Sequence, residues 1–294
     1  MTFLDLGQEW VGMGLRREHS KDLVEQLPKE IDCLEIAPEN YMNTGGEYYD
    51  QLCELAKHYP IIFHGLCMSV GSLAPLDKDH LKQIKKFLKK FNARWMSDHL
   101  CFSSIRGGQT HDLLPLPFTK EVIQHVSEKI KRIRDFLEMP FAIENVSYYV
   151  DPAPPEMTEW EFLSEVLEKA DCSLLLDVNN IYVNSVNHNF DPFKYLDNIP
   201  LERTIHMHIA GHQKKEDFIL DTHGASIIDP VWDLLANVTS RIQVPALIVE
   251  RDNNIPKLKE VLKEVSQARE IQKKSRDKKH ASLSIVKDLV EEGR

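Results

Sequence analysis

The feature that most constrains this chain is an alternation of two kinds of segment, which repeats eight times along the sequence. Short apolar, β-branched runs that are typical of buried strands alternate with longer stretches whose apolar residues recur at helical spacing. The helical spacing is clearest at 77–91, where Leu81, Ile84, Leu88 and Phe91 form one apolar stripe. The expected strands lie at 10–16, 33–40, 61–66, 94–100, 140–146, 173–180, 204–212 and 245–252. The expected helices lie at 20–29, 48–58, 77–91, 119–137, 159–169, 191–198, 229–240 and from 256 onward.

Strands that alternate with helices are expected to be parallel, because each helix carries the chain back across the sheet. Eight such units predict a sheet that closes into a (β/α)₈ TIM barrel, which commonly takes about 250 residues. A doubly wound open sheet is the alternative, but only Met13, Gly14 and Leu15 stand where a glycine-rich dinucleotide loop would follow the first strand. The sequence therefore predicts one TIM-barrel domain over residues 1–266.

Side chains that can bind metal ions recur where the expected strands end. Glu144, Asp177 and Glu250 each follow three apolar residues, and carboxylates are rarely buried in such surroundings unless they are paired. The C-terminal ends of TIM-barrel strands meet at one mouth, where active sites are built, so these side chains are expected to converge. The candidate metal ligands are His64, His99, Glu144, Asp177, Asn180, His208, Asp221, His223 and Glu250.

This set of donors favours a transition-metal centre. Imidazole and carboxylate ligands suit iron, zinc and manganese, and several such groups would be costly to bury together without a cation. Glu144 could bridge two ions through its two oxygens. The five cysteines form no CxxC pair, which argues against a structural zinc site. Iron, zinc and manganese all remain compatible with the residues alone.

The composition argues against several classes of protein. A formal net charge of −10 disfavours general nucleic-acid binding, which needs a basic face to neutralise phosphates. No apolar run approaches the roughly 20 residues that span a bilayer, and the first residues do not form a secretory signal. An odd number of cysteines without paired spacing is typical of reduced thiols. We therefore expect a cytoplasmic protein without a membrane partner.

The segment 267–294 differs in character from the barrel. Lys273, Lys274, Arg276 and Lys278 belong to a basic cluster, which is followed by apolar residues at helical spacing. This pattern predicts a charged helical C-terminal extension. An arm that packs against another subunit or a partner protein is the alternative.

Motifs along the whole expected barrel resemble, in the same order, those of the multinuclear non-haem iron-dependent oxidative enzymes. The resemblance covers about residues 8–254. The motifs are GLRREH, EIAPENYMNTGG, FHGLCMSVGS, SDHLCFS, IENVSYY, LLLDVNNIYVNS, HIAGH, DTHG and VERD.

The resemblance implies a TIM barrel of the xylose-isomerase and endonuclease IV type. It implies an enzyme that uses two or three iron ions and dioxygen to modify cysteine, or in some cases another residue, of a ribosomally made peptide. A partner protein often delivers the peptide in this family. The implied ligand sets are His64, His99 and Glu144 for one ion, Glu144, Asp177, His208 and Glu250 for a second, and Asn180, Asp221 and His223 for a third.

Other residues near these motifs have less certain assignments. His212 and Asn145 are the candidate catalytic residues. His206 stands where the family often has glutamate, so its role is open. His188 and His111 lie in long loops from which they could approach the site.

Two other functions fit the same residues. The first is a di- or trinuclear zinc- or manganese-dependent hydrolase, such as a phosphodiesterase, or a sugar isomerase on the same barrel. The acidic charge disfavours a DNA substrate, and the absence of lysine from the expected strands disfavours the isomerase. The second is a non-enzymatic metal-binding or docking protein, in which residues 38–46 could contact a peptide.

Overall fold

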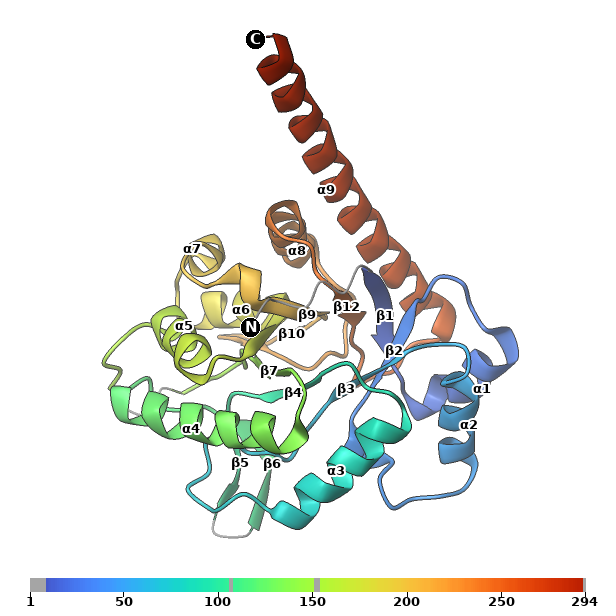
Figure 1. Cartoon of the computed structure of the whole chain (residues 1–294), viewed down its shortest axis with the longest axis vertical. Helices are drawn as coiled ribbons and strands as arrows, with labels where there is room; N and C mark the ends of the chain where they lie inside the picture. The colour runs from blue at the N-terminus through green and yellow to red at the C-terminus, as the bar shows by residue number, and fades with distance from the viewer. Residues whose placement is uncertain (1–8, 106–107, 151–153, 293–294) are drawn as a thin grey trace.

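The computed structural model of the chain describes residues 9–105, 108–150 and 154–292. Eight parallel strands close into a barrel, and helices surround it (Figure 1). The structure thus confirms the predicted (β/α)₈ fold, in which β1 closes the ring by pairing with both β2 and β12. The strands, in their order around the barrel, are β1 (Trp10–Gly14), β12 (Ala246–Val249), β9 (Thr204–Ile209), β8 (Ser173–Asp177), β7 (Phe141–Glu144), β4 (Met96–His99), β3 (Ile61–His64) and β2 (Cys33–Ile36).

The strands bury both of their faces, as parallel strands covered by helices must. Alternate residues point outward, and the outward set, which includes Phe63, Ile143 and Met207, packs against the helices. The remaining apolar residues point inward and fill the N-terminal half of the barrel. This inner apolar layer consists of Cys33, Ile62, Trp95, Ala142, Leu175, Ile205, Ala246 and Ile248.

The helices follow the predicted apolar stripes, and several of them begin at a side-chain cap. In α3, Leu81, Ile84 and Leu88 are buried, and Asp77 caps the helix by accepting hydrogen bonds from two backbone N–H groups. Thr158 and Glu161 form a reciprocal capping box at the start of α5. The helices of the barrel are α1 (Arg17–Gln26), α2 (Glu47–Leu55), α3 (Lys78–Lys90), α4 (Lys120–Leu137), α5 (Glu159–Ala170), α6 (Val178–Asn187), α7 (Pro192–Asp197) and α8 (Asp229–Arg241), with short 3₁₀ turns at Pro38–Asn40 and Leu201–Arg203.

The structure corrects several expected elements, since the strands expected at 33–40, 204–212 and 245–252 end at Ile36, Ile209 and Val249. The sixth strand was expected to run to residue 180, but β8 ends at Asp177 and α6 begins at the next residue. The Asp177 side chain causes this change, because it accepts a hydrogen bond from the backbone N–H of Asn180 at 2.8 Å and so caps the helix. The stretch after β4, expected as a loop, contains the hairpin β5 (Phe102–Ile105) and β6 (Gly108–Leu114). A second, smaller hairpin joins β10 (Gln213–Lys214) and β11 (Ile219–Leu220).

The C-terminal helix α9 (Leu258–Glu292) is continuous across the expected boundary at residue 266. Its first turns pack on the barrel through Leu258, Val261 and Val265. Beyond that boundary, Gln272 still donates a hydrogen bond to the carbonyl of Val244 at 3.2 Å. The last turns extend away from the other elements in Figure 1. A separate extension at 267–294 stays a prediction. None of the helices in the described ranges combines the length and apolar character needed to cross a bilayer.

A buried carboxyl group at the start of α5 predicts how stability depends on pH. Glu159 accepts hydrogen bonds from the Tyr195 hydroxyl at 3.0 Å and from the Asn184 amide at 3.2 and 3.3 Å. Burial raises the pKa of Glu159 to about 8, although these hydrogen bonds oppose the rise. The folded protein therefore holds a proton that the unfolded chain loses near pH 4. This contribution to stability is complete at low pH and is lost as the pH rises towards 8.

We therefore expect Glu159→Gln to have a higher melting temperature than the wild type at pH 9 and little advantage at pH 5. Thermal unfolding across this range, with Glu161→Gln at the exposed capping position as the control, measures the effect. A constant difference between wild type and Glu159→Gln at all pH values would show that the carboxyl does not titrate in this way.

Candidate metal centre

The candidate ligands occupy the inward positions directly above the inner apolar layer. Because strand side chains alternate with a period of two, the next inward residue lies two positions further along each strand. In β7, for example, Ala142 belongs to the apolar layer and Glu144 follows it into the mouth. The same step leads from Leu175 to Asp177 in β8. It also leads from Cys33, Ile62 and Ile248 to Glu35, His64 and Glu250, whereas in β4 and β9 the ligands His99 and His208 lie further beyond Trp95 and Ile205. All seven side chains are buried, namely Glu35, His64, His99, Glu144, Asp177, His208 and Glu250.

The first group comprises His64, His99 and Glu144. Their facing atoms form a nearly equilateral triangle, with His64 Nε2 at 3.0 Å from Glu144 Oε2 and 3.1 Å from His99 Nε2. The third side, from His99 Nε2 to Glu144 Oε2, measures 3.2 Å. Ser97 lies behind the triangle, and its hydroxyl is 3.0 Å from Nδ1 of His64. An Nδ1–H that donates to Ser97 leaves Nε2 of His64 free to ligate an ion.

The charges in the first group are strongly coupled. Burial would raise the pKa of Glu144, but the imidazoles of His64 and His99 hold it well below its usual range. Burial opposes protonation of His64, yet the Glu144 carboxylate raises its pKa to about 9. Burial, together with the nearby His64, lowers the pKa of His99 to about 4. These shifts make His64 an imidazolium and His99 a neutral imidazole near pH 7, and a metal ion bound at Nε2 of His64 would displace the extra proton.

Glu144 also faces a second group through its other oxygen. Its Oε1 lies 3.2 Å from Nδ1 of His208, and the same nitrogen lies 3.1 Å from Oε2 of Glu250. Asp177 joins these residues, because its ligand atom lies within 4.8 Å of those of Glu144 and His208. The two oxygens of one carboxylate therefore point to two neighbouring sets of donors, which is the arrangement of a bridging ligand.

His223 forms the third group on the loop after β11. Its Nε2 lies 2.8 Å from Oδ1 of Asp221 and 3.9 Å from Oδ2 of Asp177. Its Nδ1 lies 2.9 Å from Oδ2 of Asp252 and 3.3 Å from Oε2 of Glu250. His223 could accordingly share an ion with Asp177 and Glu250 as well as with Asp221.

Several buried polar atoms at the centre lack a hydrogen-bond partner within the described residues. Buried polar atoms are nearly always satisfied, so a cluster of exceptions needs an explanation. A metal ion fits, because each atom could act as a ligand and the oxygen and nitrogen donors match those preferred by iron, manganese or zinc. The unsatisfied atoms that belong to possible ligands are Glu144 Oε2, Asp177 Oδ2, Asn180 Oδ1 and His223 Nε2, and Nδ1 of His99 and Nε2 of His206 are also without a hydrogen bond to any described residue.

A cavity of about 480 Å³ opens above these groups at the C-terminal mouth of the barrel. Several acidic side chains line the cavity, and Arg16 also belongs to its lining. The Arg16 guanidinium forms an ion pair with Asp252 and lies 3.8 Å from Glu250. Leu66 and Leu113 add apolar surface to the lining. The volume lies in the range of small-molecule sites, which span about 300–1,000 Å³.

The two candidate catalytic residues lie just outside the cavity. The Asn145 side chain is held by the backbone of Asp177, donating to its carbonyl and accepting from its N–H, each at 2.9 Å. Nδ1 of His212 lies 2.8 Å from Oδ1 of Asn179, whose amide donates to Asp221 at 2.8 Å. Asn145 thus contacts a residue of the metal groups directly, whereas His212 reaches Asp221 only through Asn179. The catalytic roles of both residues stay predictions.

Of the two loop histidines, His188 points to a backbone carbonyl away from the metal groups. Nε2 of His188 lies 3.0 Å from the carbonyl oxygen of Tyr148, and its ring stacks on that tyrosine at 4.1 Å between centroids. The side chain of His111 lies outside the described residues.

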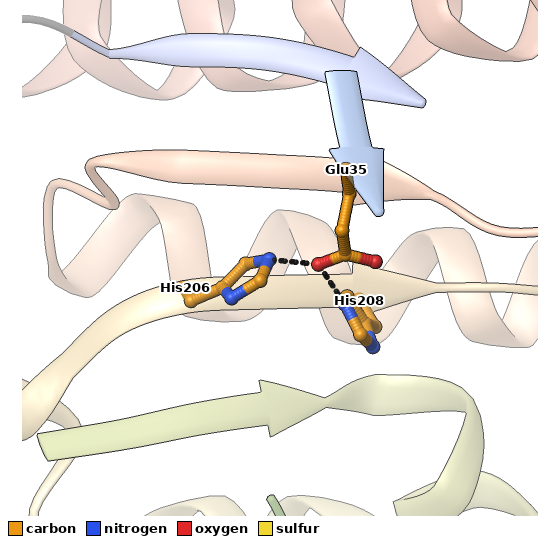
Figure 2. A group of neighbouring side chains, drawn as sticks. All are labelled: Glu35, His206 and His208. Atoms are coloured by element: carbon orange, nitrogen blue, oxygen red, sulfur yellow. Dashed lines mark hydrogen bonds and ion pairs between the residues drawn. The ribbon is translucent and has the colours of Figure 1, made fainter. Parts of the chain in front are cut away.

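Sequence reasoning missed Glu35, Asp252 and the contacts of His206. Oε2 of Glu35 lies 2.8 Å from Nε2 of His206 and 2.9 Å from Nε2 of His208 (Figure 2). The signal for Glu35 was present, because it is a carboxylate between Leu34 and Ile36 in an apolar strand.

Comparisons with known proteins find related sequences and a shared fold. A UPF0276 protein of Shewanella sediminis is 47% identical over 266 residues, which cover 90% of this chain and 95% of the relative. One of Nitrosospira multiformis is 43% identical over 275 residues, covering 93% and 97%. Among solved structures, an L-ribulose 3-epimerase gives a TM-score of 0.57 at 10% identity and covers 94% of this chain and 98% of its own. The Escherichia coli 3-keto-D-glucoside 4-epimerase YcjR gives 0.55 at 12% identity, covering 88% and 98%.

At these identities the solved structures show a shared xylose-isomerase-like barrel and nothing about the reaction. The family comparison is more specific. The sequence profile described as RiPP precursor modification enzyme MbnB/TglH/ChrH matches residues 10–273, which include the barrel and every candidate ligand. RiPP precursors are the ribosomally made peptides on which such enzymes act. The chain belongs to the MbnB/TglH/ChrH family of RiPP precursor modification enzymes.

Proposed function

We propose that this chain is an iron- and dioxygen-dependent enzyme that oxidises a residue, cysteine in the first instance, of a ribosomally made precursor peptide. Membership of the family supports a peptide substrate. The clustered imidazoles and carboxylates support a metal-dependent reaction. The five cysteines are free thiols, which supports a location in the cytoplasm.

The triangle of His64, His99 and Glu144 carries this proposal. Two histidines and one carboxylate on a single face of the ion are the donors of non-haem iron oxygenases. The three facing atoms lie 3.0, 3.1 and 3.2 Å from one another, close enough to bind one ion together.

The proposed ligand sets follow from the groups. His64, His99 and Glu144 would hold the first ion, and Glu144, Asp177, His208 and Glu250 the second. Asn180, Asp221 and His223 would hold a third where one is present. Bound iron supplies redox chemistry and lowers the pKa of a thiol that coordinates it.

The protein's own part is to admit one peptide side chain and to exclude others. The cavity of about 480 Å³ accommodates a cysteine with its neighbouring backbone. The rest of the precursor would lie outside the mouth, where a separate precursor-recognition protein would hold it.

The test uses metal-free full-length protein reloaded without oxygen. We expect Fe²⁺-loaded enzyme, after admission of dioxygen, to change the mass of a cysteine-containing peptide encoded by a neighbouring gene. A peptide in which that cysteine is replaced by alanine should stay unmodified. Mass spectrometry of the peptide with and without oxygen measures the reaction.

The same protein loaded with Zn²⁺ or Mn²⁺ is the matched control and should leave the peptide unchanged. Phosphatase or isomerase activity with those ions, together with no oxygen-dependent reaction of iron-loaded protein, would contradict the proposal and favour the hydrolase or isomerase alternative.

A further inference from the structure

One buried carboxylate oxygen below the second metal group lies 2.8 and 2.9 Å from the ring nitrogens of two histidines. Figure 2 shows Glu35 reaching from β2 across to β9, where its Oε2 lies between His206 and His208. All three side chains are buried, and the two histidines are fully enclosed. We propose that Glu35 and His206 are positioning residues that orient His208 towards the metal; this inference rests on the proposed metal-dependent function.

The two nitrogens of His208 have different surroundings. Nε2 lies 2.9 Å from Glu35, whereas Nδ1 lies 3.2 Å from Glu144 and 3.1 Å from Glu250. A neutral imidazole carries one proton, so an Nε2–H donated to Glu35 leaves the lone pair of Nδ1 for an ion. Histidine ligands of metals usually donate their other N–H to a carboxylate in this way, which fixes both tautomer and ring orientation.

His206 secures Glu35 and reaches towards the first metal group. Its Nε2 lies 2.8 Å from the same Glu35 oxygen, so the imidazoles of His206 and His208 flank that oxygen. Its Nδ1 makes a long contact of 3.5 Å with the hydroxyl of Ser97. That hydroxyl lies 3.0 Å from Nδ1 of His64. His206 therefore contacts both Glu35, which supports His208, and Ser97, which supports His64.

A separate cation held by Glu35, His206 and His208 is the competing interpretation, since their ligand atoms lie close enough. It would require His208 to give one nitrogen to this cation and the other to the second group. A neutral imidazole has a single lone pair for ligation, so His208 would have to lose both protons. The positioning role needs no such deprotonation.

The test measures metal binding rather than turnover. Glu35→Gln and His206→Gln are prepared as full-length, metal-free proteins and titrated without oxygen with Fe²⁺, and separately with Co²⁺ as a spectroscopic probe. We expect the number of ions bound at saturation to stay at the wild-type value. We expect one ion to bind about 10- to 100-fold more weakly, and the Co²⁺ ligand-field absorption to change.

Glu39→Gln is the matched control. Glu39 follows β2 on the same segment, but its carboxylate accepts from the backbone N–H groups of Leu66 and Cys67 at 3.1 and 3.3 Å. This variant should bind both metals as the wild type does. Circular dichroism of the metal-free proteins confirms folding, and His206→Gln carries the test if Glu35→Gln does not fold.

Two results would overturn the positioning role. Wild-type affinity and spectrum in both variants would show that the carboxylate does not orient His208. Loss of one full equivalent of metal at saturation would make Glu35 or His206 a ligand instead. Wild-type protein that binds the ions but never oxidises a peptide would defeat the proposed function and leave the positioning role standing.

Discussion

Glu144→Gln is expected to remove most of the metal-binding capacity of this protein. Glu144 faces His64 and His99 through one oxygen and His208 through the other, so a single substitution weakens two groups. Glutamine has a similar shape, but it lacks the negative charge and has only one oxygen. Loss of an outer partner already weakens metal binding by about 10- to 100-fold, and we expect more than 100-fold for this bridging ligand.

Metal analysis after equilibrium dialysis against Fe²⁺ without oxygen measures this effect. Glu159→Gln is the control, because Glu159 is also buried but contacts Tyr195 and Asn184 instead of the metal groups. It should bind as much iron as the wild type. A Glu144→Gln protein with full iron content would mean that the ions bind elsewhere.

Gly211→Ala is expected to lower both the stability of the protein and its metal binding, although it adds only one methyl group. Gly211 follows β9, and a Cβ there would overlap the backbone carbonyl of Ala225 and lie 2.7 Å from the carbonyl oxygen of Ser226. Backbone atoms cannot rotate away as a side chain can. Overpacking of this kind lowers the free energy of unfolding by about 1–3 kcal/mol. The overlap can be relieved only if the backbone at Ala225 and Ser226 moves, and this segment directly follows Asp221 and His223.

We therefore expect Gly211→Ala to unfold at a lower denaturant concentration and to bind less iron. Gly45→Ala is the matched control, since a Cβ at that glycine meets no atom within 4 Å. Chemical unfolding and metal analysis of both variants test the pair. Equal stability and iron content in the two variants would contradict the close contact at Gly211.

The barrel could be predicted because its signal is local and repeated. Each strand is an apolar run and each helix a periodic stripe, as Leu81, Ile84 and Leu88 illustrate in α3. Glu144 and Asp177 stood out because a carboxylate after an apolar run is unusual. The parallel topology then brings such strand ends together without further information.

Other parts of the centre depend on relations that one strand does not encode. The position of Glu35 along the barrel axis is set by the stagger between strands, because Glu35 pairs with Gly14 and Ile62. This stagger places its side chain beside that of His208. Loop conformation determines the contact between Asp252 and His223. The early end of β8 depends on a side-chain cap by Asp177, which competes with the strand pattern.

The bridging position of Glu144 is tested most directly by a crystal structure of protein purified without oxygen, with anomalous scattering recorded at the iron edge. We expect two peaks on opposite sides of the Glu144 carboxylate, one bound by His64 and His99 and the other by His208 and Glu250. A carboxylate that contacts only protein groups, with no anomalous peak beside it, would contradict the metal centre described above.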